Sequence, residues 1–481
     1  MKRIFAITLV LLMIISLCAC GKTGQSGTGS GAAKETTMAQ NEKHTASSAL
    51  SIGFAKENIT PEENVPLSGS ATRGTSSGML DYLFATCLAI SYGENNIALI
   101  FGMDIQNAYS PTSGWRNKVS RATDIPEERI QICFTHTHSA PNTGSDDPSI
   151  GRYNQMVANK MVKAAKSAIE DLAPAEAAVA SIDTENMNFV RRYIMNDGTL
   201  CGDNWGSTAS GYKCHETEAD RQLQVIRFTR DGADDVILAN FQTHSNYTMG
   251  DTAISSDVAG AFRDALEKKS GVNVLYLNGA SGNINPKSRI ADENVVKTHK
   301  EWGEKMADYA MSALENTQPV SLGALQNKQI VIDAPVNHAF DHLYDQAAEI
   351  NDYFKTTKDI SGANAMCAEA GISSVYHADT IVANSRRGQT MTMELDVYSI
   401  GDIAFVFAPV EIFDTNGMQI KEASPYAMTF ICGYANFCQG YMPSEAAYEM
   451  IGYEVATSCW AKGTAEQVVS EFLTMLNELH D

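Results

Sequence analysis

The sequence has little positive charge. Its 36 Lys and Arg residues stand against 57 Asp and Glu residues, which gives a net charge of −21. This balance argues against binding to nucleic acid and against electrostatic attraction to an anionic membrane. The sequence also lacks any Cys-x-x-Cys pair, so we do not expect a cysteine-rich structural zinc site. After the N-terminal leader it has no apolar run long enough to span a bilayer, and no internal repeat.

The N-terminus predicts export. Two basic residues precede Ile4–Leu17, an almost unbroken apolar run with the length of a secretory signal core. The run ends in Leu-Cys-Ala-Cys at 17–20, which looks like a bacterial lipobox with Cys20 as the lipidated residue. An ordinary signal peptide cut near Ala19 is the alternative. We therefore expect residues 1–20 to be a lipoprotein signal peptide, and the protein to be anchored to the outer face of the bacterial cell membrane.

The next stretch separates this leader from the folded part. Residues 21–48 carry Gly, Ser, Thr, Lys and Glu with almost no large apolar side chains. Such a segment buries too little surface to offset its ordering entropy, so it is expected to be a flexible tether. The hydrophobic content of 44% fits a globular core, and no linker marks a second domain. We predict one large domain over residues 49–481.

Short runs rich in β-forming residues alternate with amphipathic helical patterns. The predicted strands are Leu83–Tyr92, Ile97–Met103, Ile130–Phe134, Leu223–Thr229, Val236–Phe241, Val272–Leu277 and Met428–Cys432, with a hairpin over Met391–Ala408 hinged at Gly401-Asp402. The predicted helices are Arg152–Leu172, Asp257–Lys269, Val295–Asn316, Ala339–Phe354 and Thr464–Leu479. The alternation predicts an α/β fold, with a mixed β-sheet core flanked by helices. The mostly helical, polar stretch 339–387 is expected to be an insertion lying over the core.

Histidines provide the densest chemical signal. The block Phe-Thr-His-Thr-His-Ser-Ala-Pro at 134–141 directly follows a predicted strand. Residues two apart on an extended chain face the same side, so His136 and His138 are expected to point into one cleft. His244 follows another β-rich run, and strand ends are where α/β folds place their chemistry. The alternative for each histidine is a polar residue satisfied by neighbouring groups.

Other candidates also follow predicted strands. Glu411 comes after an apolar strand and a proline, where an unpaired carboxylate would be costly to bury. It either caps the following helix or binds a cation, and the pattern alone favours the cap. The run 433–443 brings tyrosines that either pack half-buried or join a site. Cys201 and Cys214 flank a polar loop and are either a disulfide or two isolated thiols.

Five blocks in the same order resemble the neutral ceramidase family. They are Gly53–Pro61 with Pro66–Gly69, the histidine block at 134–141, His244 with Ile254–Asp257, Asn278–Pro286, and the stretch from Glu411 through Tyr441 to Glu454. The resemblance covers residues 51–480 and implies a fold with one catalytic zinc at the carboxyl ends of strands. The zinc ligands that it implies are His136, His244, Glu411 and Tyr441. Such nitrogen and oxygen donors suit Zn²⁺, with an open position for water.

The resemblance also implies a substrate side lined by His138, Arg191 and Tyr453. Zinc-activated water would attack an amide carbonyl, and His138 and Tyr453 would stabilise the developing oxyanion. The acid that protonates the leaving amine is left open, with His138 as the best candidate. Arg191 would orient a polar or anionic acyl fragment, with a surface salt bridge as its alternative. The implied partner is a small-molecule or lipid substrate, ceramide-like or another N-acyl compound.

The chain departs from the family pattern in one informative block. The usual Gly-Asp-Val-Ser-Pro reads Gly-Asn-Ile-Asn-Pro at 282–286, so Asn285 replaces a serine once considered as a nucleophile. This favours zinc-activated water over a serine route. The resemblance does not extend to the C-terminal immunoglobulin-like domain of full-length ceramidases, which leaves open whether ceramide itself is cleaved.

Two other functions stay open. One is a zinc hydrolase of a different bond, an ester or a phosphoester. The other is a non-catalytic surface lipoprotein that binds its ligand on this scaffold. Retention of all four proposed ligands argues against the binding protein, since a binding module has no need of an open metal position.

Overall fold

The computed structural model describes residues 50–481 apart from 70–72, 94–95, 109–110 and 203–209. The predicted signal peptide, the lipidated Cys20 and the tether over 21–48 lie outside the described residues. The described residues all belong to one compact unit. Within the described part of the chain, no helix is both long enough and apolar enough to cross a membrane.

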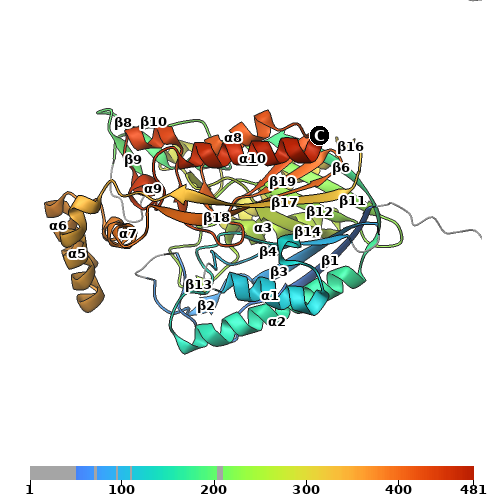
Figure 1. Cartoon of the computed structure of the whole chain (residues 1–481), viewed down its shortest axis with the longest axis horizontal. Coiled ribbons are helices and arrows are strands. Elements are labelled where there is room, and N and C mark those ends of the chain that lie inside the picture. The colour runs from blue at the N-terminus through green and yellow to red at the C-terminus, as the bar shows by residue number, and fades with distance from the viewer. Residues whose placement is uncertain (1–49, 70–72, 94–95, 109–110, 203–209) are drawn as a thin grey trace, which may run out of the picture. The chain divides into compact units, whose positions relative to one another are not determined.

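The larger of two central sheets has nine strands in the order β14-β12-β11-β6-β1-β3-β4-β5, with β16 paired to β6 (Figure 1). Its strands are β1 (Leu50–Asn58), β3 (Phe84–Tyr92), β4 (Ile97–Met103), β5 (Ile130–Phe134), β6 (Ala173–Asp183), β11 (Gln222–Arg230), β12 (Val236–Phe241), β14 (Asn273–Asn278) and β16 (Gln318–Pro319). The pairs β4–β5 and β12–β14 are parallel and the other pairs are antiparallel, so the sheet is mixed.

The smaller central sheet has the order β17-β18-β19-β21. Its strands are β17 (Leu325–Pro335), β18 (Thr390–Ile400), β19 (Ile403–Phe407) and β21 (Met428–Cys432). β18 and β19 form the predicted hairpin, in which Ile400 pairs with Ile403 across the turn. Gly401 has a φ of 57°, and a Cβ there would lie 2.1 Å from the Ser321 carbonyl oxygen, so the turn requires glycine.

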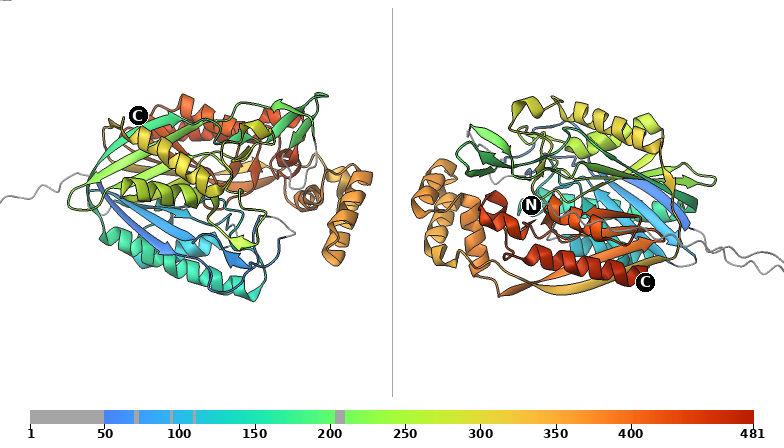
Figure 2. Two further views of the ribbon diagram at one scale, coloured as in Figure 1. Left: turned by 180° about the vertical axis from the view of Figure 1, so that it is seen from behind. Right: turned by 90° about the horizontal axis from the view of Figure 1, so that it is seen from above.

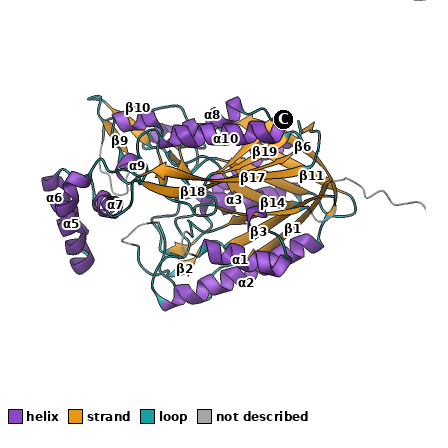
Figure 3. Cartoon of the chain, in the orientation of Figure 1, coloured by secondary structure: helices purple, strands orange, loops and turns teal. Residues whose placement is uncertain are grey.

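Helices cover the outer face of each sheet (Figures 1 and 3). The larger sheet packs against α1 (Thr112–Thr123), α2 (Pro148–Glu170), α3 (Asp257–Ser270) and α4 (His299–Leu314), and the smaller sheet against α8 (Asp414–Ala423) and α10 (Thr464–His480). Between the sheets, alternate residues such as Leu88 and Ile100 meet Phe405 and Phe430 in one apolar cluster. The predicted single α/β domain with a mixed sheet flanked by helices is therefore confirmed.

An insertion of three helices connects β17 to β18. It comprises α5 (Tyr344–Thr357), α6 (Ile360–Ala370) and α7 (Val375–Ser385), which confirms the predicted helical character of 339–387. Figures 1 and 2 show these helices projecting from one end of the sheets, rather than lying over the core as expected. The reason is that their apolar faces, including Ile350 and Ile381, form a cluster of their own.

Short elements complete the fold. They are β2 (Gly78–Met79), β7 (Phe189–Val190), β8 (Arg192–Met195), β9 (Leu200–Gly202), β10 (Tyr212–His215), β13 (Ala253–Ile254), β15 (Ile284–Asn285), β20 (Glu411–Ile412), β22 (Tyr441–Met442) and α9 (Tyr453–Ala456), with 3₁₀ turns at Glu127–Arg129, Ala291–Glu293, Asp341–Leu343 and Glu445–Glu449. β8 lies between β9 and β10, so Cys201 on β9 and Cys214 on β10 are about two strand spacings (~10 Å) apart. That separation exceeds disulfide geometry, and the structure forms no bond between these two described residues.

Replacing Phe405 with alanine tests the interface between the sheets. Phe405 is fully buried there and stacks on Phe430 with ring centroids 5.2 Å apart. Phe405→Ala is expected to lower the free energy of unfolding by about 3–5 kcal/mol, because a large cavity opens in a packed core. Val331→Ala is the control, since Val331 is 63% exposed and should change stability by less than about 0.5 kcal/mol. Denaturant unfolding measures both, and equal small effects would contradict the packing described.

Candidate metal centre

The site forms where chain segments leave four strands of the two sheets. β14 and β5, the two ends of the larger sheet's strand order, contact each other, so the segments following β5 and β12 come together. Thr137 and Ser245 form a parallel bridge between these segments, and the His138 N–H donates to the Ser245 carbonyl at 2.9 Å. The smaller sheet adds the segments after β19 and β21, and Phe134 N–H donates to the Tyr434 carbonyl.

His136 reaches the site through an unusual backbone conformation. Its φ of 59° lies in the left-handed region, so the segment is not extended at this residue. The predicted reason for the shared direction of the two histidines, alternation along an extended strand, is therefore wrong. The two rings nevertheless meet edge to face, with centroids 4.8 Å apart. Such strain in a non-glycine residue costs about 1–3 kcal/mol and clusters at functional sites.

Backbone carbonyls fix the ring orientation of both His136 and His244. Nδ1 of His136 lies 2.9 Å from the Gln106 carbonyl oxygen, and Nδ1 of His244 lies 2.8 Å from that of Ser281. A carbonyl accepts only, so each Nδ1 carries the proton and each Nε2 keeps its lone pair. Both Nε2 atoms are buried and make no hydrogen bond with the described residues.

Glu411 faces these two lone pairs. Its Oε2 lies 3.4 Å from Nε2 of His136 and 3.4 Å from Nε2 of His244, and it too is buried without a hydrogen bond among the described residues. Burial raises the pKa of Glu411 to about 8, although Arg191 and Tyr441 act in the opposite direction. Helix α8 begins at Asp414 with Phe413 as its N-cap, so the alternative role of Glu411 as a helix cap is not realised.

Tyr441 lies beside Glu411. The two residues pair in the short parallel ribbon of β20 and β22, and the Tyr441 ring stacks on His244 with centroids 6.3 Å apart. Burial raises the pKa of the Tyr441 phenol well above its ordinary value, although Arg191 acts against this. A cation next to this phenol would have the reverse effect and favour its ionised form.

The donor set fits a zinc ion. Burial is the main cause that lowers the pKa of His136 and of His244 well below the ordinary value, so both imidazoles are neutral at pH 7 and need not lose a proton to bind metal. Two neutral imidazoles, a carboxylate and a phenol suit Zn²⁺ better than a hard ion such as Mg²⁺. A backbone carbonyl that accepts from Nδ1 of each imidazole is the usual support of a histidine ligand.

His138 belongs to the same cluster. The ring nitrogens of His136, His138 and His244 lie within 4.8 Å of one another, so geometry alone offers a third imidazole. The contacts to Glu411 come from the other two histidines, whereas Nε2 of His138 lies 3.3 Å from the Gln106 amide nitrogen. Burial, with the charges of Arg191 and Arg73, lowers the pKa of His138 to about 3.

Arg191 borders the cluster and is not a surface residue. It is buried, its Nε donates to Glu454 at 2.7 Å, and its guanidinium lies 5.3 Å from the Tyr441 ring centroid. Arg192 approaches the other oxygen of Glu454 at 3.6 Å. The alternative of a surface salt bridge is therefore wrong, because the ion pair is buried. Tyr453, in α9, has its ring centroid 5.7 Å from that of Tyr441.

Sequence reasoning missed the residues behind the predicted ligands. Tyr434 stacks on His136 at 4.0 Å, and its hydroxyl lies 2.9 Å from that of Ser281. Gln106 and Glu454 support His136 and Arg191, respectively. The position of Gln106 in the sequence could have identified it. It follows β4, the parallel neighbour of β5, so it lies beside the residues that follow β5.

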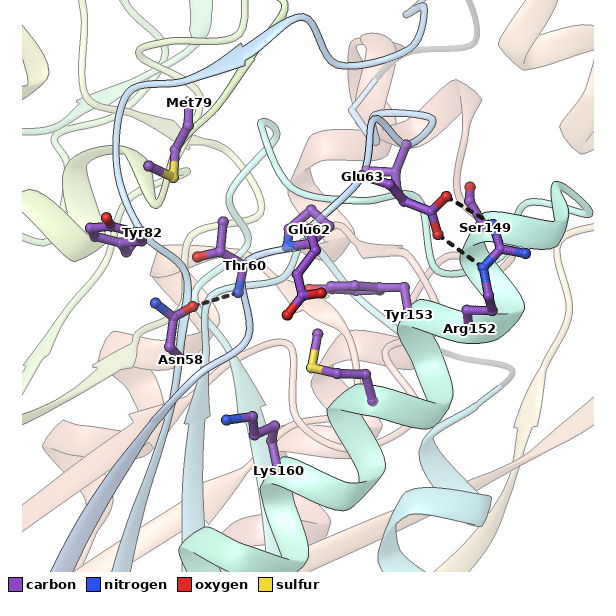
Figure 4. A pocket seen from close by; sticks show the side chains of 13 residues that line it. Asn58, Thr60, Glu62, Glu63, Met79, Tyr82, Ser149, Arg152, Tyr153 and Lys160 are labelled. Carbon is purple, nitrogen blue, oxygen red and sulfur yellow. Dashed lines mark hydrogen bonds and ion pairs between the residues drawn. The ribbon is translucent and has the colours of Figure 1, made fainter.

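A separate cavity of about 770 Å³ lies between the loop after β1 and helix α2 (Figure 4). Its walls include Tyr82 and Met156, with an exposed ion pair between Arg152 and Glu63 at 2.8 Å. None of the predicted ligands or substrate-side residues lines this cavity. It is therefore a surface feature distinct from the candidate metal centre.

Fold and site together define an α/β protein with a buried histidine, carboxylate and phenol cluster at strand ends.

Comparison with models of known families and with curated protein sequences finds no match. Two solved structures share the fold. A ceramidase complexed with C2 has a TM-score of 0.69 and 17% identity, over 90% of this chain and 75% of that chain. The neutral ceramidase from Pseudomonas aeruginosa has a TM-score of 0.68 and 18% identity, over 90% of this chain and 74% of that chain.

At this level of identity the likeness establishes the fold. The chain has the fold of the neutral ceramidases, so the resemblance seen in the sequence is confirmed at that level. The roles predicted for individual residues stay predictions.

Removing a ligand should remove the metal. We expect purified protein to carry about one zinc ion per chain, and His136→Ala or His244→Ala to reduce this to near zero, because each loses one of the protein ligands. His138→Ala should retain the zinc. His377→Ala is the matched control, since His377 is buried in α7 of the insertion. Metal analysis of the four folded variants decides, and zinc retained in His136→Ala but lost in His138→Ala would reverse the two roles.

Proposed function

We propose that the protein is a zinc-dependent amidohydrolase that cleaves the amide bond of a ceramide-like lipid or of another N-acyl compound. One observation carries the proposal: Nε2 of His136, Nε2 of His244 and Oε2 of Glu411 converge without other hydrogen-bond partners among the described residues. The shared fold with a ceramidase complexed with C2 supports a substrate of that kind.

The proposed metal ligands are His136, His244, Glu411 and Tyr441. Zn²⁺ bound there would supply a Lewis acid and lower the pKa of a bound water towards ~7. The protein's own contribution is preorganisation, because the carbonyls of Gln106 and Ser281 hold both imidazoles in one tautomer before metal arrives. Burial of these groups excludes bulk water, which strengthens every electrostatic contact in the site.

His138 and Tyr453 are the proposed hydrogen-bond donors to the substrate oxygen. With its pKa lowered to about 3, mainly by burial, His138 is neutral at pH 7 and offers an N–H rather than a positive charge. The Tyr453 phenol stays protonated, because burial raises its pKa well above the ordinary value despite the opposing charge of Arg191. Donors aimed at a developing oxyanion stabilise the transition state more than the substrate.

Arg191 is the proposed anchor for a polar part of the substrate. Glu454 fixes its Nε, and its Nη1 lies 3.4 Å from Oδ1 of Asn285. Nη2 of Arg191 is buried and makes no hydrogen bond with the described residues, so it is available as a donor. A guanidinium held in this way orients a carbonyl or an anionic group with little further loss of entropy.

Water is the proposed nucleophile. Asn285 occupies the position of the family serine, and its Oδ1 accepts from Asn246 at 2.9 Å. Ser281, the serine of the same segment, is buried and hydrogen-bonded to Tyr434 through its hydroxyl. An asparagine amide is not a nucleophile of this kind, and the Ser281 hydroxyl meets a phenol rather than the general base that an activated serine requires.

We propose further that the protein is exported and lipid-anchored through Cys20. The support for this is the basic, apolar and lipobox pattern of the sequence. A lipid anchor would hold the enzyme next to a membrane that contains its substrate.

A substrate panel tests the reaction class. The purified enzyme should hydrolyse short-chain N-acyl sphingosines or other N-acyl amines, lose activity on chelation, and regain it with Zn²⁺. No acyl-enzyme should accumulate, because no residue becomes acylated. His138→Ala should lower turnover by about 10²–10⁴-fold. Faster cleavage of matched esters or phosphoesters would replace the amidase proposal, and binding without turnover of any of them would favour the surface binding protein.

A further inference from the structure

Asp257 is a buried carboxylate that the proposed reaction does not use. It is the first residue of α3, it is fully buried, and its φ of 56° lies in the left-handed region. A non-glycine residue held in this conformation is strained, so its surroundings must fix it there.

Four donors converge on the two oxygens of Asp257. Oδ1 accepts from the backbone N–H groups of Tyr247 at 3.0 Å and Val258 at 2.7 Å. Oδ2 accepts from the backbone N–H of Thr248 at 2.7 Å and from its hydroxyl at 2.5 Å. Three of these four donors belong to the turn that follows His244, and only the Val258 N–H belongs to helix α3. A helix cap alone does not explain this arrangement, since capping satisfies donors of the helix itself.

The same carboxylate is linked to the segment that carries His136 and His138. The Thr248 hydroxyl gives its one proton to Asp257, so it accepts from the Ser139 hydroxyl at 3.1 Å. The backbone N–H of Asp257 donates to the Ser255 hydroxyl at 2.9 Å.

Ser255 continues this connection through its backbone. Its carbonyl accepts from the Thr137 hydroxyl at 2.7 Å, and its N–H donates to the Ser139 carbonyl at 2.9 Å. Asp257 therefore stands between the His244 turn and the histidine block, and both segments are bonded to the short stretch 255–257.

We propose that Asp257 is a positioning residue of the metal centre, whose carboxylate sets the separation of the two histidine-bearing segments. This rests on the proposed zinc site. The role requires a carboxylate in particular, because all four groups around it are donors. Asparagine accepts through one oxygen only, so either orientation of its amide leaves two donors without an acceptor. Partners behind metal ligands typically contribute 10–100-fold to metal affinity.

The test measures metal binding of Asp257→Asn. We expect zinc affinity, determined by competition with a chelator, to fall by about 10–100-fold. The visible absorption spectrum of the Co²⁺-substituted protein should also change, because the imidazoles are no longer held in one geometry. Asp171→Asn is the matched control. Asp171 accepts from the Phe54 N–H at 2.9 Å and from Arg230 at 2.6 Å, so its loss should lower the melting temperature without altering zinc affinity or the Co²⁺ spectrum.

The outcomes separate this inference from the metal site itself. Wild-type zinc affinity and an unchanged Co²⁺ spectrum in Asp257→Asn, even with a lower melting temperature, would show that Asp257 is only a structural cap. Failure of the wild-type protein to bind zinc would instead overturn the proposed function. If Asp257→Asn does not fold, Thr248→Val decides, because it removes only the hydroxyl between Asp257 and Ser139. That variant should weaken zinc binding measurably, and unaltered affinity would refute the positioning role.

Discussion

Oε2 of Glu411 lies 3.4 Å from Nε2 of His136 and 3.4 Å from Nε2 of His244, and both imidazoles are buried. Without a cation, an ionised Glu411 would place acceptor against acceptor in an environment of low polarity, where each unsatisfied group is costly, and burial accordingly raises the pKa of Glu411 to about 8. A divalent cation would relieve both contacts together. The surrounding residues hold these groups in place: backbone carbonyls orient both rings, and Tyr434 stacks on His136 while its hydroxyl is hydrogen-bonded to that of Ser281.

The fold brings these groups together from distant parts of the chain. Contact between β14 and β5, the ends of the strand order, joins the segments after β5 and β12, and the smaller sheet contributes those after β19 and β21. Local conformations then direct the side chains: His136, Asp257, Tyr434 and Asn436 all have positive φ and all are buried. Strained non-glycine residues in and next to the segments that form the site indicate that the fold gives up some stability there.

Much of this architecture was predictable because it depends on local pattern. The strands 97–103, 130–134, 236–241 and 428–432 have the predicted bounds, since each is a short β-rich run between turn residues. β1, β6 and β17 were missed, because their partly exposed patterns show no clean alternation of apolar residues. Parallel pairing at the carboxyl ends, which places Gln106 and Ser281 behind the histidines, depends on long-range contacts that no single segment encodes.

The most direct test of the metal centre is X-ray absorption at the zinc edge on the purified, zinc-loaded protein. The first shell should contain only nitrogen and oxygen at about 2.0–2.2 Å, with the outer-shell scattering of two imidazoles. His244→Ala should remove that imidazole signal together with the metal. A sulfur shell near ~2.3 Å, or an ion surrounded by oxygen alone, would show that zinc binds elsewhere and would contradict the assignment of His136, His244, Glu411 and Tyr441.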